Sequence, residues 1–490
     1  MFFTKKNIYL DNTATTRTRR EVIAEMNKYF SAVYANPSSI HQDGLIARGS
    51  LEMARERIAG ALGCLAAELI FTGSGSESNN LAIRGAAKAL AAQGRHLVTS
   101  KIEHSSVLNT CRALAKDGWE VTYLDVDTQG RLDLKQLSAA LRPDTVLVSL
   151  VYVNNDIGTI QDAAQIVKLV KGKQILLHLD GVQALPYLPL DLTRLGADLV
   201  SFSGHKLYAP KGVGLLYCKT GTPLEPIIYG GGQEFDFRSG SENVPYIVGL
   251  SKAIELNTKE KEAYTRQLTA WRDRLINGVL ASVPDSLLTG DAADRAPNHA
   301  SFCFKGVNGK MLVKELSWRG FDVASGSACS SARNTPSHVL LACRIPEDYL
   351  YGSIRVTLGR YNSGRDITKF LRVLPEVVAK MRAAKIPYEN AGIFISQAEL
   401  RTKLSAGEHL QLLDVRPVKY PWKMIPGSLH IPHWRLQGQL RKLDPAAETV
   451  VVCYQGDILS PEAQQLLVKN GFKNVKVLQG GLDNYPGELI

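Results

Sequence analysis

Short apolar runs alternate with helical patterns between about residues 65 and 218, and this alternation constrains the fold more than any other feature. Several runs are apolar at nearly every position, so a strand formed by them has to be covered on both faces. Intervening stretches such as SESNNLAIRGAAKALAAQG can supply the covering helices. The pattern therefore predicts an α/β domain with a mostly parallel sheet, in which functional residues gather at the carboxyl ends of strands. The runs read AAELIFT, RHLVTS, EVTYLDV, TVLVSLVYV, QILLHLD, ADLVSFS and GVGLLYC.

The rest of the chain predicts two further regions, because 490 residues are too many for one ordinary core. Residues 251–385 mix amphipathic helices with few β runs and predict a smaller α+β domain, which the N-terminal segment joins. The large domain then spans about 15–250, within a region of 1–385. A break in the pattern predicts a linker at 386–392. Beyond it, residues 393–490 show a fresh β/α alternation and predict a separate α/β domain.

Composition limits the class of protein. Hydrophobic residues make up 45% of the chain and charged residues 21%, which is typical of a globular protein. The net charge of +11 is spread along the chain, so we expect no direct nucleic-acid partner. The sequence shows no membrane span or export signal, and its seven scattered cysteines lack a C-x-x-C spacing for zinc. We therefore expect a cytoplasmic protein without a metal.

Polar residues at four predicted strand ends together suit one cofactor. His104 follows the run RHLVTS, Asp180 and Gln183 lie in LHLDGVQ, and Lys206 lies in SFSGHK. A Gly/Ser loop containing Ser76 opens a helix, whose free backbone amides suit a phosphate. Pyridoxal phosphate needs a lysine for covalent attachment, a carboxylate for its ring nitrogen and a phosphate cradle. Each residue alone also fits an ordinary structural role, but the set predicts a pyridoxal phosphate site.

The motifs along residues 7–385 resemble those of NifS/IscS-type cysteine desulfurases, in order and spacing. These are pyridoxal phosphate enzymes of fold type I within the class V aminotransferase group, and the resemblance implies a homodimer with active sites at the subunit interface. The motifs are YLDNTATT, NPSSIH, FTGSGSESNN, VNNDIG, DGVQ, SFSGHKLYAPKGVG, RSGSEN, SGSACSS and SIRVTLGR.

The resemblance implies a role for each matching residue. Lys206 holds the cofactor, Asp180 its ring nitrogen and Gln183 its phenolic oxygen, while His104 stacks on the ring. Arg355 binds the substrate carboxylate, as a guanidinium does well. The remaining implied ligands of cofactor or substrate are Asn36, Gly75, Ser76, Asn155, Ser203, His205 and, from the other subunit, Ser241.

A few positions depart from the family's pattern without removing a group that the chemistry needs. Asp156 stands where glutamate is usual, and Gln42 where arginine is common. Ser76 and Ser241 stand where threonine is frequent.

The segment DVASGSACSSARNT carries the cysteine expected to take sulfur. Cys329 lies among small polar residues, which makes a structural role in a core improbable and suits a thiol that enters a site and leaves. The resemblance implies that L-cysteine reacts with the cofactor, the Cys329 thiolate attacks its sulfur, and alanine and a Cys329 persulfide result. His104 is the expected proton carrier. The cysteines at positions 64, 111, 218, 303 and 343 are interpreted as structural.

The tail resembles a rhodanese domain, through LLDVRP, IPGSLHIP and VLQGGLDNYP. In that family a loop cysteine carries sulfur as a persulfide, but here the position falls on Tyr454, with Cys453 one step earlier. The arginines that often mark the loop are replaced by Gln455 and Leu459, and Asp457 adds a negative charge. Two hypotheses stay open: a degenerate or docking module, and transfer of sulfur from Cys329 to Cys453 across a short tether.

Three other interpretations compete with the desulfurase. A selenocysteine lyase or another class V aminotransferase uses the same cofactor frame, and a sulfur-relay scaffold would lack catalysis. Cys329 argues against a plain aminotransferase, and the intact Lys206, Asp180 and His104 argue against a scaffold. The sequence leaves the final sulfur acceptor open, an iron–sulfur scaffold protein being one class.

Overall fold

The computed structural model describes residues 7–326, 336–383, 393–417, 423–454 and 459–482, together with 485, 487 and 489. The described residues divide into a larger compact unit that ends at Met381 and a smaller one that begins at Arg382.

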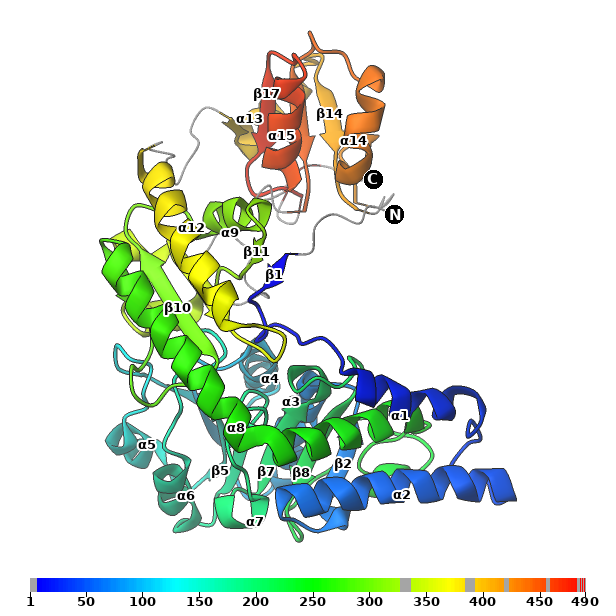
Figure 1. Ribbon diagram of the computed structural model, residues 1–490. Coiled ribbons are helices and arrows are strands. Elements are labelled where there is room, and N and C mark those ends of the chain that lie inside the picture. The colour runs from blue at the N-terminus through cyan, green and yellow to red at the C-terminus, as the bar shows by residue number, and fades with distance from the viewer. Residues whose placement is uncertain are drawn as a thin grey trace. The chain divides into compact units, whose positions relative to one another are not determined.

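A seven-stranded sheet forms the centre of the larger unit (Figure 1). Strand β8 is antiparallel to both of its neighbours, β2 and β7, and every other pair is parallel. The predicted mostly parallel sheet is therefore confirmed. In spatial order the strands are β2 (Leu69–Thr72), β8 (Gly214–Cys218), β7 (Leu199–Ser203), β6 (Leu176–Asp180), β5 (Thr145–Val151), β3 (His96–Ser100) and β4 (Glu120–Leu124).

Alternate residues of these strands pack on opposite faces of the sheet. In β3, Leu97 belongs to one apolar cluster and Val98 to another, and Leu147 and Val148 of β5 divide in the same way. Burial on both faces explains why the runs are apolar at nearly every position. The helices of this region are α1 (Arg20–Ser31), α2 (Gln42–Leu62), α3 (Gly75–Leu90), α4 (Ser105–Lys116), α5 (Leu134–Ala140), α6 (Ala163–Lys171) and α7 (Leu192–Leu195).

The long helix α8 (Val244–Ser282) joins this region to a smaller α+β part of the same unit (Figure 1). It packs against α1 and α2 near its start and against β9 and β10 near its end. The helix runs without a break through residue 250, so the two parts share one element. The smaller part has the antiparallel strands β9 (Ser286–Leu288), β10 (His299–Phe304) and β12 (Ser353–Thr357), and helices α9 (Gly309–Trp318), α10 (His338–Ala342), α11 (Glu347–Leu350) and α12 (Gly364–Ala383).

The N-terminal segment belongs to this smaller part. Strand β1 (Ile8–Tyr9) pairs in parallel with β11 (Phe321–Asp322), and Asp11 bridges to Thr357 at the end of β12. The segment then continues toward Lys206 at the edge of the large sheet, where the contacts of Thr13 lie.

The second unit contains a five-stranded parallel sheet with helices between its strands. In spatial order the strands are β13 (Phe394–Ile395), β17 (Val475–Leu478), β16 (Thr449–Val452), β14 (Gln411–Asp414) and β15 (Leu429–His430), and the helices are α13 (Gln397–Ser405), α14 (His433–Gln439) and α15 (Leu459–Lys469). Across both units, none of the described helices combines the length and the apolar character needed to cross a membrane.

Candidate active site

The carboxyl ends of four neighbouring strands bring the predicted cofactor residues to one edge of the sheet. Asp180 is the last residue of β6, and Lys206 lies in a short 3₁₀ turn directly after β7. Asn155 follows β5, and His104 follows β3. Because β7, β6, β5 and β3 are adjacent and parallel, these ends meet at the same edge.

Two side chains that the sequence did not single out connect Asp180 to His104. Asn79 donates from Nδ2 to Asp180 Oδ2 at 2.8 Å and to Ser106 Oγ at 2.9 Å. Ser106 Oγ lies 2.8 Å from His104 Nδ1. The backbone N–H of Val182 donates to the other oxygen of Asp180, 3.1 Å away. Asp180 is only 4% exposed, so these donors are what stabilise its carboxylate at the strand end.

His104 caps the N-terminus of α4. The backbone N–H of Ser106 donates to Nδ1 at 3.1 Å, so the neutral ring carries its proton on Nε2. Burial lowers the pKa of His104 below its usual 6.5, and the Lys206 ammonium lowers it further against the opposing effect of Asp180. The ring is therefore neutral at pH 7.

Backbone carbonyls of the N-terminal segment hold Lys206 and Gln183. Lys206 Nζ donates to the carbonyl oxygens of Thr13 at 2.7 Å and Ala14 at 2.8 Å. Gln183 Nε2 donates to the same Thr13 oxygen at 3.1 Å. The motif DNTATT is visible in the sequence, but spacing alone could not predict a contact between Thr13 and Lys206, which are 193 residues apart.

The start of α3 packs closely against the end of β7. A Cβ atom at Gly75 would lie 2.9 Å from Val182 Cγ2 and 3.0 Å from Ser203 Cβ, so glycine is what permits this approach. The first backbone amides of α3 thus lie beside Ser203, which is buried. His205 Nδ1 lies 3.1 Å from Thr15 Oγ1, and burial lowers the pKa of His205 to about 4, with smaller contributions from nearby lysines.

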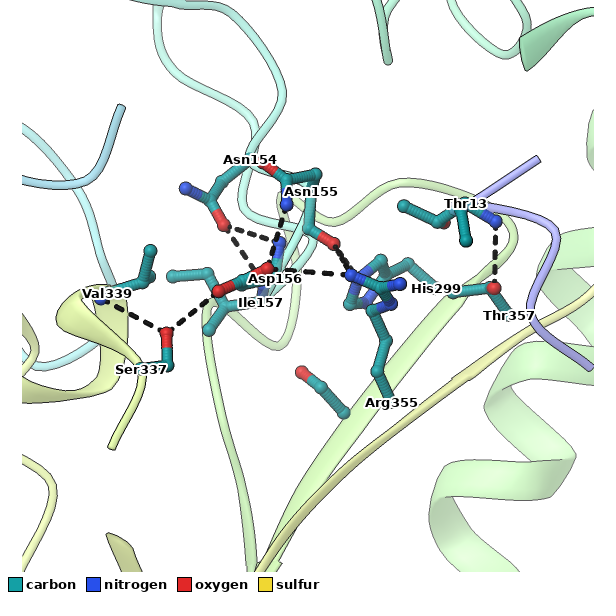
Figure 2. Close-up of polar contacts among 12 residues, drawn as sticks. Thr13, Asn154, Asn155, Asp156, Ile157, His299, Ser337, Val339, Arg355 and Thr357 are labelled. Carbon is teal, nitrogen blue, oxygen red and sulfur yellow. Dashed lines mark hydrogen bonds and ion pairs between the residues drawn. The ribbon is translucent and has the colours of Figure 1, made fainter. Parts of the chain in front are cut away.

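Arg355 occupies a buried position on β12, near the Asn155 segment (Figure 2). Its Nη2 donates to Asp11 Oδ1 at 2.9 Å, and its Nη1 donates to the Asn155 carbonyl oxygen at 3.1 Å. His299 Nε2 also donates to that carbonyl, at 3.1 Å. Asp156 Oδ1 lies 3.5 Å from Arg355 Nη1.

Three predicted site residues lie on the surface of the unit. Asn36, Ser76 and Ser241 are exposed, and in the described part of the chain none of them hydrogen-bonds to another predicted site residue. Cys329 lies outside the described residues, in the gap between 326 and 336. In the five cysteines interpreted as structural, burial raises the pKa of each thiol to about 12.

The corresponding strand end of the second unit is different. Cys453 follows β16, is 2% exposed and packs in an apolar cluster with Leu413 and Phe472. The next residue, Tyr454, has its ring 5.5 Å from the guanidinium carbon of the buried Arg416. Arg416 in turn donates to Asp414 at 2.7 Å. Residues 455–458, which include Gln455 and Asp457, lie outside the described residues.

Comparison with known proteins defines the class of both units. The family described as Aminotransferase class-V matches residues 8–370, and the family described as Rhodanese-like domain matches residues 396–488. The chain therefore belongs to the class-V aminotransferase family, and the predicted rhodanese-like fold of the tail is confirmed.

Similar relatives within that class are named cysteine desulfurases. A protein of Dictyoglomus turgidum named cysteine desulfurase IscS is 44% identical over 385 residues, which are 79% of this chain and 98% of the relative. A namesake from Methanosarcina thermophila is 44% identical over 377 residues, 77% of this chain and 93% of the relative. The solved structure of a NifS-like protein matches with a TM-score of 0.72 at 34% identity, covering 76% of this chain and 100% of that one. The structure described as SspA in complex with cysteine has a TM-score of 0.64 at 35% identity, covering 72% and 99%. The predicted resemblance to NifS/IscS-type enzymes is confirmed.

Proposed function

We infer that the protein is a pyridoxal phosphate-dependent cysteine desulfurase that converts L-cysteine into L-alanine and leaves the sulfur as a persulfide on Cys329. The observation that carries the inference is the meeting of Lys206, Asp180 and His104 at strand ends along one edge of the sheet. The names of the relatives support the desulfurase over another class V aminotransferase activity. The reaction balances: L-cysteine and the Cys329 thiol contain the same atoms as L-alanine and the Cys329 persulfide.

The donor set at this edge suits pyridoxal phosphate. Asp180 is a buried carboxylate available for a protonated ring nitrogen, and Lys206 supplies the amine for attachment. The start of α3 at Gly75, with Ser203 and His205 beside it, offers amide and side-chain donors to a phosphate. When bound, the cofactor withdraws electrons from the substrate Cα, which makes loss of its proton possible.

The chain's own residues then bind the substrate and move protons. Arg355 offers a guanidinium to the substrate carboxylate, beside Asn155, and Asn36 is the second expected substrate contact. Gln183 is the expected donor to the phenolic oxygen, near Thr13. Neutral His104 carries its N–H on Nε2, where it can donate a hydrogen bond into the site, and it is the expected proton carrier.

A homodimer accounts for the exposed residues among the predicted ligands. Large apolar side chains are exposed along α1, α2 and the segment between them, with Tyr34 75% and Ile40 92% exposed. An exposed group of this kind is typical of a protein interface. In a dimer, Ser241 of each subunit would complete the phosphate site of the other, together with Ser76.

The burial of Cys453 favours a docking or degenerate role for the rhodanese-like unit. A persulfide acceptor has to meet its donor, and a thiol packed against Leu413 and Phe472 can do so only after local unfolding. We therefore propose that Cys329, in a cytoplasmic enzyme, delivers sulfur to a separate acceptor such as an iron–sulfur scaffold protein. We place the domain boundary in the predicted linker, 386–392.

A single-turnover experiment tests the proposed function. Full-length protein loaded with pyridoxal phosphate is mixed with ³⁵S-labelled L-cysteine, alanine is quantified, and the label is mapped by peptide mass spectrometry. We expect one alanine per labelled Cys329, no alanine from Cys329→Ser, and normal turnover from the control Cys303→Ala. Label on Cys453 would instead support internal transfer, and unlabelled protein with no alanine would reject the desulfurase. Parallel assays with selenocysteine separate a desulfurase from a lyase, because only a lyase works without Cys329.

A further inference from the structure

Asp156 makes contacts in two directions with its two carboxylate oxygens (Figure 2). Oδ1 accepts a hydrogen bond from Asn155 Nδ2 at 2.8 Å and lies 3.5 Å from Arg355 Nη1. Oδ2 accepts a hydrogen bond from the Ser337 hydroxyl at 2.8 Å. Asp156 is only 4% exposed, so water screens neither contact strongly.

The backbone around Asp156 is itself fixed. The Asn154 side chain accepts hydrogen bonds from the backbone N–H groups of Asp156 and Ile157, at 2.8 and 3.0 Å. Gly158 has φ of +79°, and a Cβ there would lie 2.7 Å from His299 Nδ1, which requires glycine at this turn. The carboxylate therefore stands on a rigid support.

Ser337 is the second residue after the gap that contains Cys329, and hydrogen bonds fix its side chain. Its hydroxyl caps α10 by accepting from the backbone N–H of Val339 at 3.2 Å. The neighbouring His338 places Nε2 3.0 Å from the backbone oxygen of Glu103, next to His104.

The residue that precedes the gap lies at the same place. Gly326, Ser337, Asp156 and Arg355 line one small cavity of about 10 Å³. A Cβ built on Gly326 would lie 3.6 Å from Ser337 Cβ. Both described flanks of the Cys329 segment thus meet beside the carboxylate that also faces Arg355.

We propose that Asp156 is a positioning residue that joins the substrate-carboxylate arginine to the flank of the Cys329 segment. One oxygen orients Arg355 and Asn155, and the other holds Ser337, so the substrate-carboxylate arginine and the described flank of the Cys329 segment share one support. This proposal rests on the proposed function. It predicts that the two bonds of Asp156 affect different kinetic constants.

The test compares variants of the full-length holoenzyme that break one or both sides. Ser337→Ala removes the bond to Asp156 and the cap of α10 but leaves the Arg355 side of Asp156 intact. We expect kcat for alanine formation to fall about 3–10-fold, the size typical of one lost hydrogen bond, while KM changes less than twofold. Ser337→Thr keeps the hydroxyl and should restore most of kcat. Asp156→Ala breaks both sides and should also weaken binding of L-alanine, measured by calorimetry, by about tenfold or more. Asp156→Asn keeps the shape, and its effects should be smaller than those of alanine.

The outcomes separate the proposal from a merely structural role and from failure of the proposed function. If Ser337→Ala and Ser337→Thr have the same kcat, or if Ser337→Ala raises KM as much as it lowers kcat, the positioning role is wrong. Should Asp156→Ala fail to fold, as thermal unfolding will show, the two serine variants still decide. Wild-type protein that makes no alanine from cysteine overturns the proposed function itself.

Discussion

Strand β6 of the first unit and strand β16 of the second end in different ways. Asp180, at the end of β6, is a buried charge surrounded by donors from Asn79 and Val182. Cys453, after β16, is buried among apolar side chains, with Tyr454 beside it over Arg416. Both folds place the carboxyl ends of parallel strands at one edge. The first brings Asp180, Lys206 and His104 together there, whereas the charged pair at the second, Asp414 and Arg416, is buried and paired with itself. The fold thus provides a place for a site, and the side chains decide whether the site exists.

The largest expected effect tests the polar strand end directly. Lys206→Ala removes the amine that attaches the cofactor, so we expect the visible absorption of the protein to disappear and turnover to fall by about 10³-fold or more. Absorption spectra and alanine assays on the full chain measure both. The control is Lys261→Ala, a partly buried lysine of α8 that donates hydrogen bonds to the carbonyls of Leu185 and Leu188, outside the site. A coloured, active Lys206→Ala protein would remove the basis of the comparison.

The elements that carry Lys206, Asp180 and His104 could be predicted because their chemistry follows strands with an unmistakable apolar pattern. The contacts that orient them could not be predicted. Asn79 reaches Asp180 across 101 residues, and Ser337 reaches Asp156 across 181, so these pairs depend on how distant segments pack. The burial of Cys453 was equally hidden, since a cysteine after a strand can face a core or a loop.

A smaller effect concerns the stability of the same polar edge. Burial raises the pKa of Glu103 to about 8, and the Asp180 carboxylate adds to this, against hydrogen bonds from Ser100 and the β5 backbone. The folded protein therefore holds a proton on Glu103 that the unfolded chain loses near pH 4.5. The contribution of Glu103 to the free energy of unfolding is fully present below pH 4.5 and is lost as pH rises toward 8. Glu103→Gln needs no proton, and we expect its free energy of unfolding to exceed that of the wild type by up to about 5 kcal/mol at pH 9 but to match it at pH 4.5.

Urea unfolding of both proteins at several pH values measures this difference. The informative quantity is the change of the gap between them with pH, because a constant gap would reflect packing alone. A gap that closes as pH rises would show that Glu103 is ionised in the folded protein. That result would also mean that burying an ionised carboxylate beside His104 costs less free energy than the burial of Glu103 indicates.

The smallest expected effect sharpens the other half of the comparison. Cys453→Ala removes a buried sulfur from the apolar cluster of the second unit, which should lower the stability of that unit by about 1 kcal/mol. Alanine formation should change less than twofold, because the thiol is not where an acceptor has to be. Cys303→Ala, equally buried in the first unit, is the matched control for loss of packing. A several-fold slower turnover of Cys453→Ala, but not of Cys303→Ala, would contradict this expectation. In that case the second unit would also carry sulfur, and Cys453 would have to become exposed during turnover.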